Sequence, residues 1–298
     1  MSYANDSTKH KKNNLNFAGI FTAITTPFNS DESIAFDKLE SNIQKWNKLP
    51  FKGYVIEGCT GEYVYLTTEE KLQVVKKSRE LISRDKILIG GSGCESTRET
   101  IYVTKKMAEL GVDAVMVVTP SYYKSKMTDE ALIRHYEQVA NNSPVPIVLY
   151  NVPIFTRFKK ECLKLLSLAD IDIGVESVAH LAKHPNIIGI KECGDSVNSE
   201  DRSAPRANQK RRFSARSFIS RNSATQLFRL GAVGTFCALS NVLGKEICDL
   251  YDLCLKGTSA KEEAQALQNS LIAPNTAVQS LSTYGHIKKI IRNLRLYY

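Results

Sequence analysis

The chain has 298 residues, of which 43% are hydrophobic and 24% are charged, a composition that is ordinary for a globular protein. It contains no run of about 18 or more apolar residues, so we expect no membrane span. The net charge of +9 is concentrated in the stretches 202–221 and 288–295 and in lysines near the N-terminus, and the rest of the chain is mildly acidic. This distribution argues against a nucleic-acid partner.

The N-terminus and the cysteines bear on the cellular compartment. Residues 1–16 are polar and lysine-rich, and we expect them to form a disordered tail. They lack the apolar core of a secretory signal and contain no Arg, so they match neither a secretory signal nor a mitochondrial presequence. The seven cysteines form no CxxC pair, which favours a reducing compartment. His180 and His184 are four residues apart, but the pattern is too weak to predict a metal site.

Short apolar runs alternate with amphipathic helical patterns along most of the chain. Runs of this length are typical of parallel strands that are buried on both faces. We expect strands at 19–25, 53–57, 86–90, 113–119, 146–151, 187–191 and 232–239. Helices are predicted from Thr67 or Thr68, at 96–110 and at 129–141, and after residue 239 the pattern is helical only, with helices at 241–255 and 260–270 and in the last segment.

Repeated strand–helix units imply right-handed crossovers and a parallel sheet. The seven predicted strands indicate an α/β fold, a (β/α)8 TIM barrel with additional C-terminal helices. The eighth strand is expected between Lys191 and Ala232. A doubly wound open sheet is the alternative, and the absence of a GxGxxG motif after the first strand counts against it. We expect the barrel to span 17–240 and a helical extension to span 241–298.

Active sites of such barrels lie at the carboxyl ends of the strands. Lys191 stands at the end of an apolar run there, and lysine is rarely buried without a reason. Desolvation favours the uncharged form of an amine, and an uncharged amine attacks a ketone to form an imine. The alternative interpretation is a lysine that extends from the strand end into solvent.

Three more residues at these strand ends have side chains suited to catalysis or binding. Tyr150 is suited to pass protons as a general acid and base, or else it is a packed aromatic residue. Thr60, between two glycines, is suited to bind a carboxylate, or else it belongs to a plain tight turn. Tyr122 is suited to extend a proton relay, and the alternative is that it is an exposed loop residue.

Several motifs in consistent order resemble one family of enzymes. Gly58-Cys59-Thr60-Gly61-Glu62, Tyr150-Asn151-Val152-Pro153 and Gly189-Ile190-Lys191-Glu192 are similar to the glycine–threonine, tyrosine and Schiff-base lysine motifs of the dihydrodipicolinate synthase and N-acetylneuraminate lyase family. The similarity runs from about 19 to 195 and resumes at about 230. Within the family, stretches such as 91–97, 116–123, 184–191, 230–243 and 271–278 most resemble the 4-hydroxy-2-oxoglutarate aldolases.

The resemblance implies roles for these residues. Lys191 would form the imine with a 2-oxo acid, and Tyr150 would shuttle the proton. Tyr122 would support Tyr150, either within the same subunit or from a neighbouring one. The substrate-binding positions implied are Cys59, Thr60 and Cys193. No metal or organic cofactor is implied, and a homo-oligomer, a dimer or tetramer, is expected. The resemblance implies a mitochondrial location, whereas the N-terminus as given indicates a cytoplasmic one.

The activity implied is cleavage of 4-hydroxy-2-oxoglutarate to pyruvate and glyoxylate. Another pyruvate-forming reaction of the family and a catalytically silent barrel are the alternatives. Three departures from the family pattern bear on this choice. Cys59 stands where a hydroxyl residue usually completes the relay, and Phe155 stands where dihydrodipicolinate synthases carry an arginine. The Ser/Arg-rich stretch 202–229 does not resemble the family and leaves the seventh strand of the barrel without a recognisable sequence.

Overall fold

The structure, a computed structural model, describes residues 15–152, 171, 173–192 and 232–280. Seven parallel strands form one sheet in the order β6-β5-β4-β3-β2-β1-β7. All seven lie where the apolar runs predict them. Their bounds are β1 Gly19–Ala23, β2 Gly53–Ile56, β3 Ile87–Gly91, β4 Ala114–Val118, β5 Ile147–Asn151, β6 Ile187–Glu192 and β7 Gly234–Cys237.

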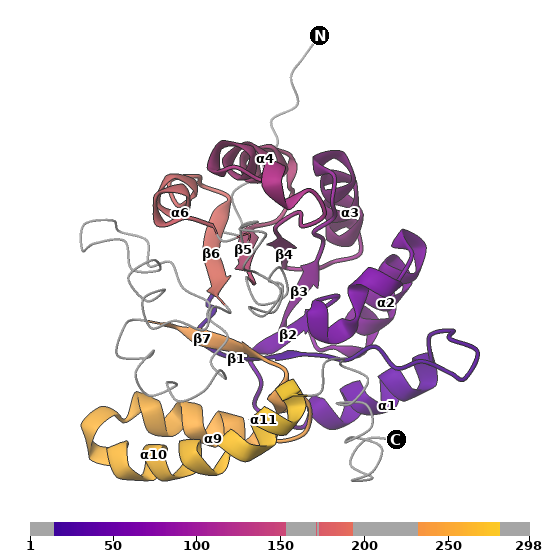
Figure 1. The fold of residues 1–298 in the computed structure, drawn as a ribbon. Helices are drawn as coiled ribbons and strands as arrows, with labels where there is room; N and C mark the ends of the chain where they lie inside the picture. The colour runs from indigo at the N-terminus through magenta and orange to yellow at the C-terminus, as the bar shows by residue number, and fades with distance from the viewer. Residues whose placement is uncertain (1–14, 153–170, 172, 193–231, 281–298) are drawn as a thin grey trace, which may run out of the picture.

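The sheet curls into a nearly closed barrel whose two open edges are β6 and β7 (Figure 1). The eighth strand is expected in the chain between these two edges, in residues 193–231, which lie outside the described part, as does the atypical stretch 202–229. The order of the strands and their parallel pairing confirm the TIM-barrel fold class.

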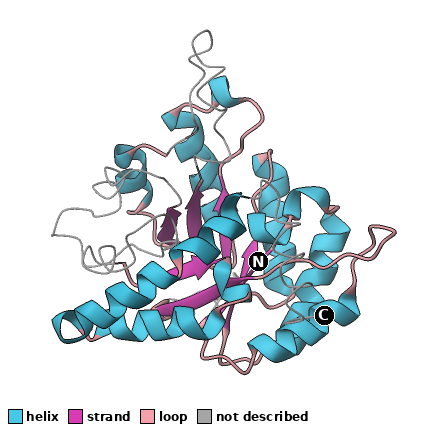
Figure 2. Ribbon diagram, turned by 60° about the horizontal axis from the view of Figure 1, so that its bottom comes forward, coloured by secondary structure: helices cyan, strands magenta, loops and turns pink. Residues whose placement is uncertain are grey.

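Helices cover the outside of the strands (Figures 1 and 2). Their bounds are α1 Phe36–Trp46, α2 Thr68–Leu81, α3 Thr97–Glu109, α4 Asp129–Asn142, α6 Val175–Leu181, α9 Gly244–Leu255, α10 Lys261–Ser270 and α11 Ile272–Ser280. Helix α1 is the one long element in the described ranges that the sequence patterns did not predict. The predicted helix starts are confirmed, because Thr67 forms a capping box with Glu70, and Ser96 caps α3. No helix in the described ranges is long and apolar enough to cross a membrane.

Alternation along the strands divides the buried side chains into two layers. One layer fills the barrel interior, with Phe21, Val55, Ile89, Met116 and Val148 among its members. The other fills the space between the strands and the helices, and includes Trp46 and many Ile, Leu and Val side chains. Packed side chains therefore fill the barrel interior beneath the carboxyl ends of the strands, so the barrel is not a pore.

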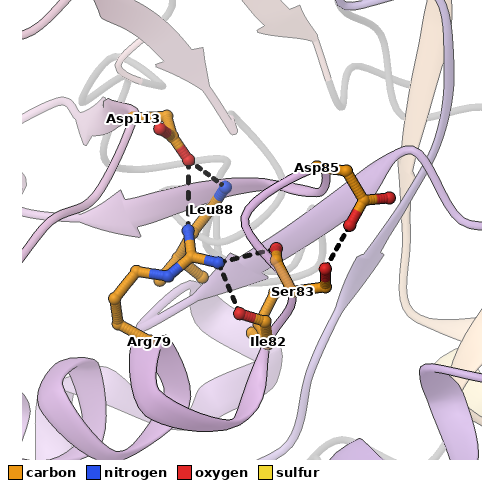
Figure 3. A network of polar contacts seen from close by, with 6 residues as sticks. All are labelled: Arg79, Ile82, Ser83, Asp85, Leu88 and Asp113. Carbon is orange, nitrogen blue, oxygen red and sulfur yellow. Dashed lines mark hydrogen bonds and ion pairs between the residues drawn. The ribbon is translucent and has the colours of Figure 1, made fainter.

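A polar network ties the opposite, amino-terminal ends of β3 and β4 to helix α2. The Arg79 guanidinium donates to the carbonyls of Ile82 and Ser83 at 2.7 and 2.8 Å and lies 3.3 Å from the Asp113 carboxylate (Figure 3). That carboxylate also accepts a hydrogen bond from the backbone N–H of Leu88 at 2.9 Å. The network is distant from the carboxyl ends of the strands, so it serves the fold.

Helix α9 packs directly on β1, and α10 packs on α9 (Figure 1). The C-terminal helices therefore begin within the layer of helices that surrounds the barrel. The buried Asn241 side chain at the start of this region donates to the carbonyls of Ala23 and Ala238, each at 2.7 Å. Trp46 Nε1 donates to the Asn241 carbonyl at 3.1 Å, which links α1 to the same point.

Candidate active site

Lys191 and Tyr150 meet at the carboxyl ends of β6 and β5. They are register partners in neighbouring strands, and Lys191 Nζ lies 4.0 Å from the centre of the Tyr150 ring. Both side chains are almost fully buried, with exposed fractions of 5% and 3%. A cation over an aromatic face is stabilised by the ring quadrupole, most strongly where water is excluded. The lysine therefore does not extend into bulk solvent, which was the alternative interpretation of its position.

Cys59 follows β2 and joins this pair from across the barrel, because β3 and β4 lie between β2 and β5. The Tyr150 hydroxyl donates to Cys59 Sγ at 3.4 Å. Burial raises the pKa of the Cys59 thiol, while the Lys191 charge and the hydrogen bond from Tyr150 act in the opposite direction. Cys237, at the end of β7, has its pKa raised to about 11 by burial, again opposed by Lys191. Both side chains are thiols at neutral pH, and a thiol is a weak acceptor for the Tyr150 hydroxyl.

The segment after β2 is a 3₁₀ turn over Cys59–Gly61 that brings Thr60 to the mouth of the barrel. Thr60 is buried there, with an exposed fraction of 5%. The Thr26 hydroxyl, at the end of β1, donates to the Gly61 carbonyl at 2.7 Å and so fixes the turn. The amino-terminal end of such a turn presents backbone N–H groups that suit a carboxylate.

Glu57 is an unusual residue immediately before this turn. Its backbone has φ of 57°, in the left-handed region that a residue with a Cβ adopts at a cost. The side chain is only 2% exposed, and neither carboxyl oxygen has a hydrogen-bond partner within the described residues. Burial raises its pKa to about 8, and the Lys71 charge opposes the effect. The group is therefore a neutral carboxylic acid at neutral pH.

Tyr122 lies in the loop that follows β4, and its side chain is 77% exposed in the single chain. Its backbone N–H and that of Ser121 donate to the Glu95 carboxylate, each at 3.0 Å. The Tyr122 ring packs edge-on against Tyr123 at 4.9 Å between ring centres. The loop is thus well anchored, while a relay from Tyr122 to Tyr150 stays a prediction.

Of the other sequence-based candidates, the two histidines lie away from the site. Cys193 and Phe155 lie outside the described residues. His180 Nε2 is 2.8 Å from Glu137 Oε1 and His184 Nε2 is 3.0 Å from Asn141 Oδ1, so both histidines bridge α6 and its following turn to α4. Among the described residues, no group of three or more His, Cys, Asp or Glu side chains is placed to hold a metal ion.

Some residues that shape the site were not singled out from the sequence. Two of them, Asn151 and Glu192, directly follow Tyr150 and Lys191 and bond to each other at 2.8 Å. Their place at the strand ends was the available signal. The residues that shape the site and were not singled out from the sequence are Thr26, Glu57, Glu95, Asn151 and Glu192.

Comparisons with known proteins agree with this geometry. A 4-hydroxy-tetrahydrodipicolinate synthase from Thermodesulfovibrio yellowstonii is 34% identical over 266 residues, which cover 88% of this chain and 83% of the relative. The structure of the synthase of that name from Methylacidiphilum fumariolicum SolV superposes with a TM-score of 0.81 at 28% identity, over 94% of this chain and 87% of that one.

A second solved structure is a chloride-inhibited dihydrodipicolinate synthase from Acinetobacter baumannii in complex with pyruvate. It has a TM-score of 0.81 at 27% identity, over 94% of this chain and 89% of that one. The profile of the dihydrodipicolinate synthetase family matches residues 16–296. The chain therefore belongs to the dihydrodipicolinate synthetase family.

Proposed function

We propose that this protein is a class I lyase or synthase that forms a Schiff base between Lys191 and a 2-oxo acid such as pyruvate. The observation that carries the proposal is the buried Lys191 amine, held 4.0 Å from the Tyr150 ring centre. Membership of the family supports the same chemistry. So does the pyruvate bound by the synthase from Acinetobacter baumannii.

In the proposed reaction, Lys191 Nζ attacks the ketone carbon and forms a carbinolamine. Loss of water gives the protonated imine, which draws electrons from the neighbouring carbon–carbon bond during cleavage, or from a C–H bond before condensation. Tyr150 delivers and removes the protons that these steps require, with Cys59 as the acceptor of its hydroxyl. Thr60 and the N–H groups of its turn hold the substrate carboxylate.

The printed names of the relatives favour a condensation. Their product, 4-hydroxy-tetrahydrodipicolinate, is a cyclic dicarboxylate that would be built from pyruvate and an amino-aldehyde carrying the second carboxylate. The comparisons support this reaction better than the cleavage of 4-hydroxy-2-oxoglutarate that the sequence motifs led us to expect.

The sequence itself favours the cleavage as a second candidate. Phe155 replaces the arginine that dihydrodipicolinate synthases carry after the tyrosine motif, so a cation for the second carboxylate is missing at that position. Cleavage of 4-hydroxy-2-oxoglutarate gives pyruvate and glyoxylate through the same imine. A sialic acid lyase reaction differs only in the substrate tail.

Borohydride reduction in the presence of pyruvate tests the shared chemistry. Intact mass should show one reduced pyruvate adduct, and peptide mapping should place it on Lys191. Lys86 provides a control: burial lowers its pKa, but it lies before the start of β3 and its Nζ donates to the Leu49 and Phe51 carbonyls at 3.2 and 2.9 Å. Lys191→Arg should abolish the adduct and Lys86→Arg should keep it; an adduct on Lys86 alone, or none, would contradict the proposal and favour a catalytically silent barrel.

Coupled assays then separate the two candidate reactions. Release of pyruvate from 4-hydroxy-2-oxoglutarate, without consumption of pyruvate in the presence of the amino-aldehyde, would select the aldolase. The reverse pattern would select the synthase. Pyruvate release from N-acetylneuraminate alone would reject both in favour of the sialic acid lyase.

Assembly and location complete the proposal. The exposed rings of Tyr122 and Tyr123 beside the mouth of the barrel are suited to pack against a second copy, which supports a dimer or tetramer. Sedimentation of the purified chain tests the oligomer. A mitochondrial or cytoplasmic location stays a prediction, to be tested by imaging of the tagged protein.

A further inference from the structure

The pairing of β5 with β6 contains a bulge just before Lys191. Ile147 pairs with Ile187, but the next residue of β5, Val148, pairs with Gly189, so Ile188 is an extra residue in β6. The layers of the core show the same feature independently. Ile187 and Ile190 lie in the layer beneath the helices, whereas Ile188 packs with the residues of the barrel interior. A regular strand would place 188 and 190 on the same face.

The bulge decides where Lys191 points. Counting from Ile187 in regular alternation would place Lys191 on the helix side of the sheet. The extra residue shifts the alternation by one, so Lys191 lies opposite Tyr150 and faces the interior. Bulges near active sites commonly redirect a side chain in this way. A register shift of one residue moves every following side chain to the opposite face of the sheet.

The next register pair beyond Lys191 and Tyr150 is Glu192 with Asn151. Asn151 Nδ2 donates to Glu192 Oε2 at 2.8 Å, and Asn151 Oδ1 accepts the backbone N–H of Ile173 at 3.2 Å. The Asn151 side chain is only 1% exposed. A hydrogen bond from a buried amide to a carboxylate is stronger than a typical protein hydrogen bond. This bond forms only when β5 and β6 are paired in this register.

We propose that Asn151 and Glu192 are positioning residues that lock β5 and β6 in the bulged register and thereby hold the Lys191 amine against Tyr150. Neither residue touches the reacting atoms. The inference rests on the proposed Schiff-base function, because its effect is read through Lys191. A displacement of the amine by about 1 Å is enough to slow a reaction roughly 100-fold, so a loosened register should be visible in kinetics before it is visible in the fold.

The test uses the rate at which borohydride traps the pyruvate adduct in the full chain. Glu192→Leu removes the acceptor, and Asn151→Asp places a second carboxylate beside that of Glu192, where like charges repel. Each variant should trap the adduct roughly 10- to 100-fold more slowly at saturating pyruvate, while half-saturation changes little. Glu192→Gln keeps an oxygen for Asn151 and should trap at close to the wild-type rate.

The double variant Asn151→Asp with Glu192→Gln restores one donor and one acceptor with the roles exchanged. It should recover most of the rate that Asn151→Asp loses, which a general loss of stability would not allow. Asp113→Ala is the control for stability alone, since it disrupts a polar network at the other end of the barrel (Figure 3). It should lower the Tm and leave the trapping rate unchanged.

The outcomes separate the two proposals. A wild-type protein that forms no adduct removes the proposed function. A normal wild-type rate with equally fast trapping in Glu192→Leu and Asn151→Asp overturns the positioning role. Failure of the double variant to recover overturns the pairing of the two side chains. Slowing by Asp113→Ala to the same extent would assign the effect to stability and also overturn the proposal.

Discussion

Lys191 Nζ lies over the face of the Tyr150 ring, 4.0 Å from its centre, while the hydroxyl at the far end of the ring donates to Cys59 Sγ at 3.4 Å. One residue therefore makes two different contacts that matter for the proposed chemistry. Its ring face stabilises a nearby positive charge, such as that of the protonated imine in the proposed reaction. Its hydroxyl is the group suited to move protons.

Tyr150→Phe separates these two contacts because it keeps the ring and removes the hydroxyl. We expect turnover to fall roughly 10²- to 10⁴-fold, the usual contribution of a general acid–base group, while slow adduct formation persists. Steady-state assays and borohydride trapping measure the two effects. Tyr54→Phe is the control, since its hydroxyl donates to Asn47 Oδ1 at 2.8 Å in the helix layer. Equal turnover in the wild type and Tyr150→Phe would show that the hydroxyl moves no essential proton.

Cys59→Ala and Cys59→Ser test the acceptor of that hydroxyl. Removal of the acceptor in Cys59→Ala should cost about 1 kcal/mol, which corresponds to roughly a 5-fold loss of turnover. Cys59→Ser offers a better acceptor and should match or exceed the wild type. Cys94, a thiol on the neighbouring loop that contacts the Ser92 carbonyl, supplies the control Cys94→Ala, which should be neutral. A larger loss in Cys59→Ser than in Cys59→Ala would contradict this relay.

The strands and the Lys191–Tyr150 pair were predictable because their signals are local. An apolar run predicts a buried strand, and the carboxyl end of a barrel strand predicts a reactive residue. The bulge at Ile188 was not predictable, since it depends on how β6 pairs with β5 rather than on either segment alone. The left-handed backbone of Glu57 was not predictable either, because a positive φ is expected of glycine rather than of a residue with a Cβ.

Exposure also limits what the sequence can predict. The position of Tyr122 in its motif implies a role in the relay. Its ring is exposed in the single chain, so a contact with Tyr150 depends on a second copy of the chain or on a ligand. Helix α1 lacked a strong start signal, because Ala35 at its N-cap gives no side-chain hydrogen bond. Tertiary packing of Trp46, Leu39 and Ile43 stabilises it instead.

Thr26→Val tests whether the turn that carries Thr60 must be held in place. The variant keeps the size of the side chain and removes the bond to the Gly61 carbonyl, worth about 1 kcal/mol. If the turn binds the substrate carboxylate, the KM for the 2-oxo acid should rise roughly 5-fold with a smaller change in kcat. Thr22→Val is the matched control, since the buried Thr22 hydroxyl has no partner among the described residues. A rise of KM in both variants would exclude a specific role for the turn.

Asp113→Ala tests the network at the amino-terminal end of the barrel. The substitution leaves Arg79, whose side chain is buried, with only the Ile82 and Ser83 carbonyls, and it deprives the Leu88 N–H of its acceptor. The free energy of unfolding should fall by about 1.5–3 kcal/mol, the range for hydrogen bonds to charged groups. Chemical denaturation measures this change. The exposed ion pair of Lys106 with Glu109 is the comparison, and Glu109→Ala should cost less than about 1 kcal/mol.

Glu57→Gln should change how stability depends on pH. The folded chain keeps a proton on Glu57 up to a pKa of about 8, whereas the unfolded chain releases it near 4.5. Between these values the unfolded state binds fewer protons, so the wild type loses stability as pH rises, by at most about 1.4 kcal/mol per pH unit. The uncharged Gln lacks this slope, and its Tm advantage should grow from pH 5 to pH 8. A difference in Tm that stays constant from pH 5 to pH 8 would mean that the buried carboxyl is already ionised in the folded protein.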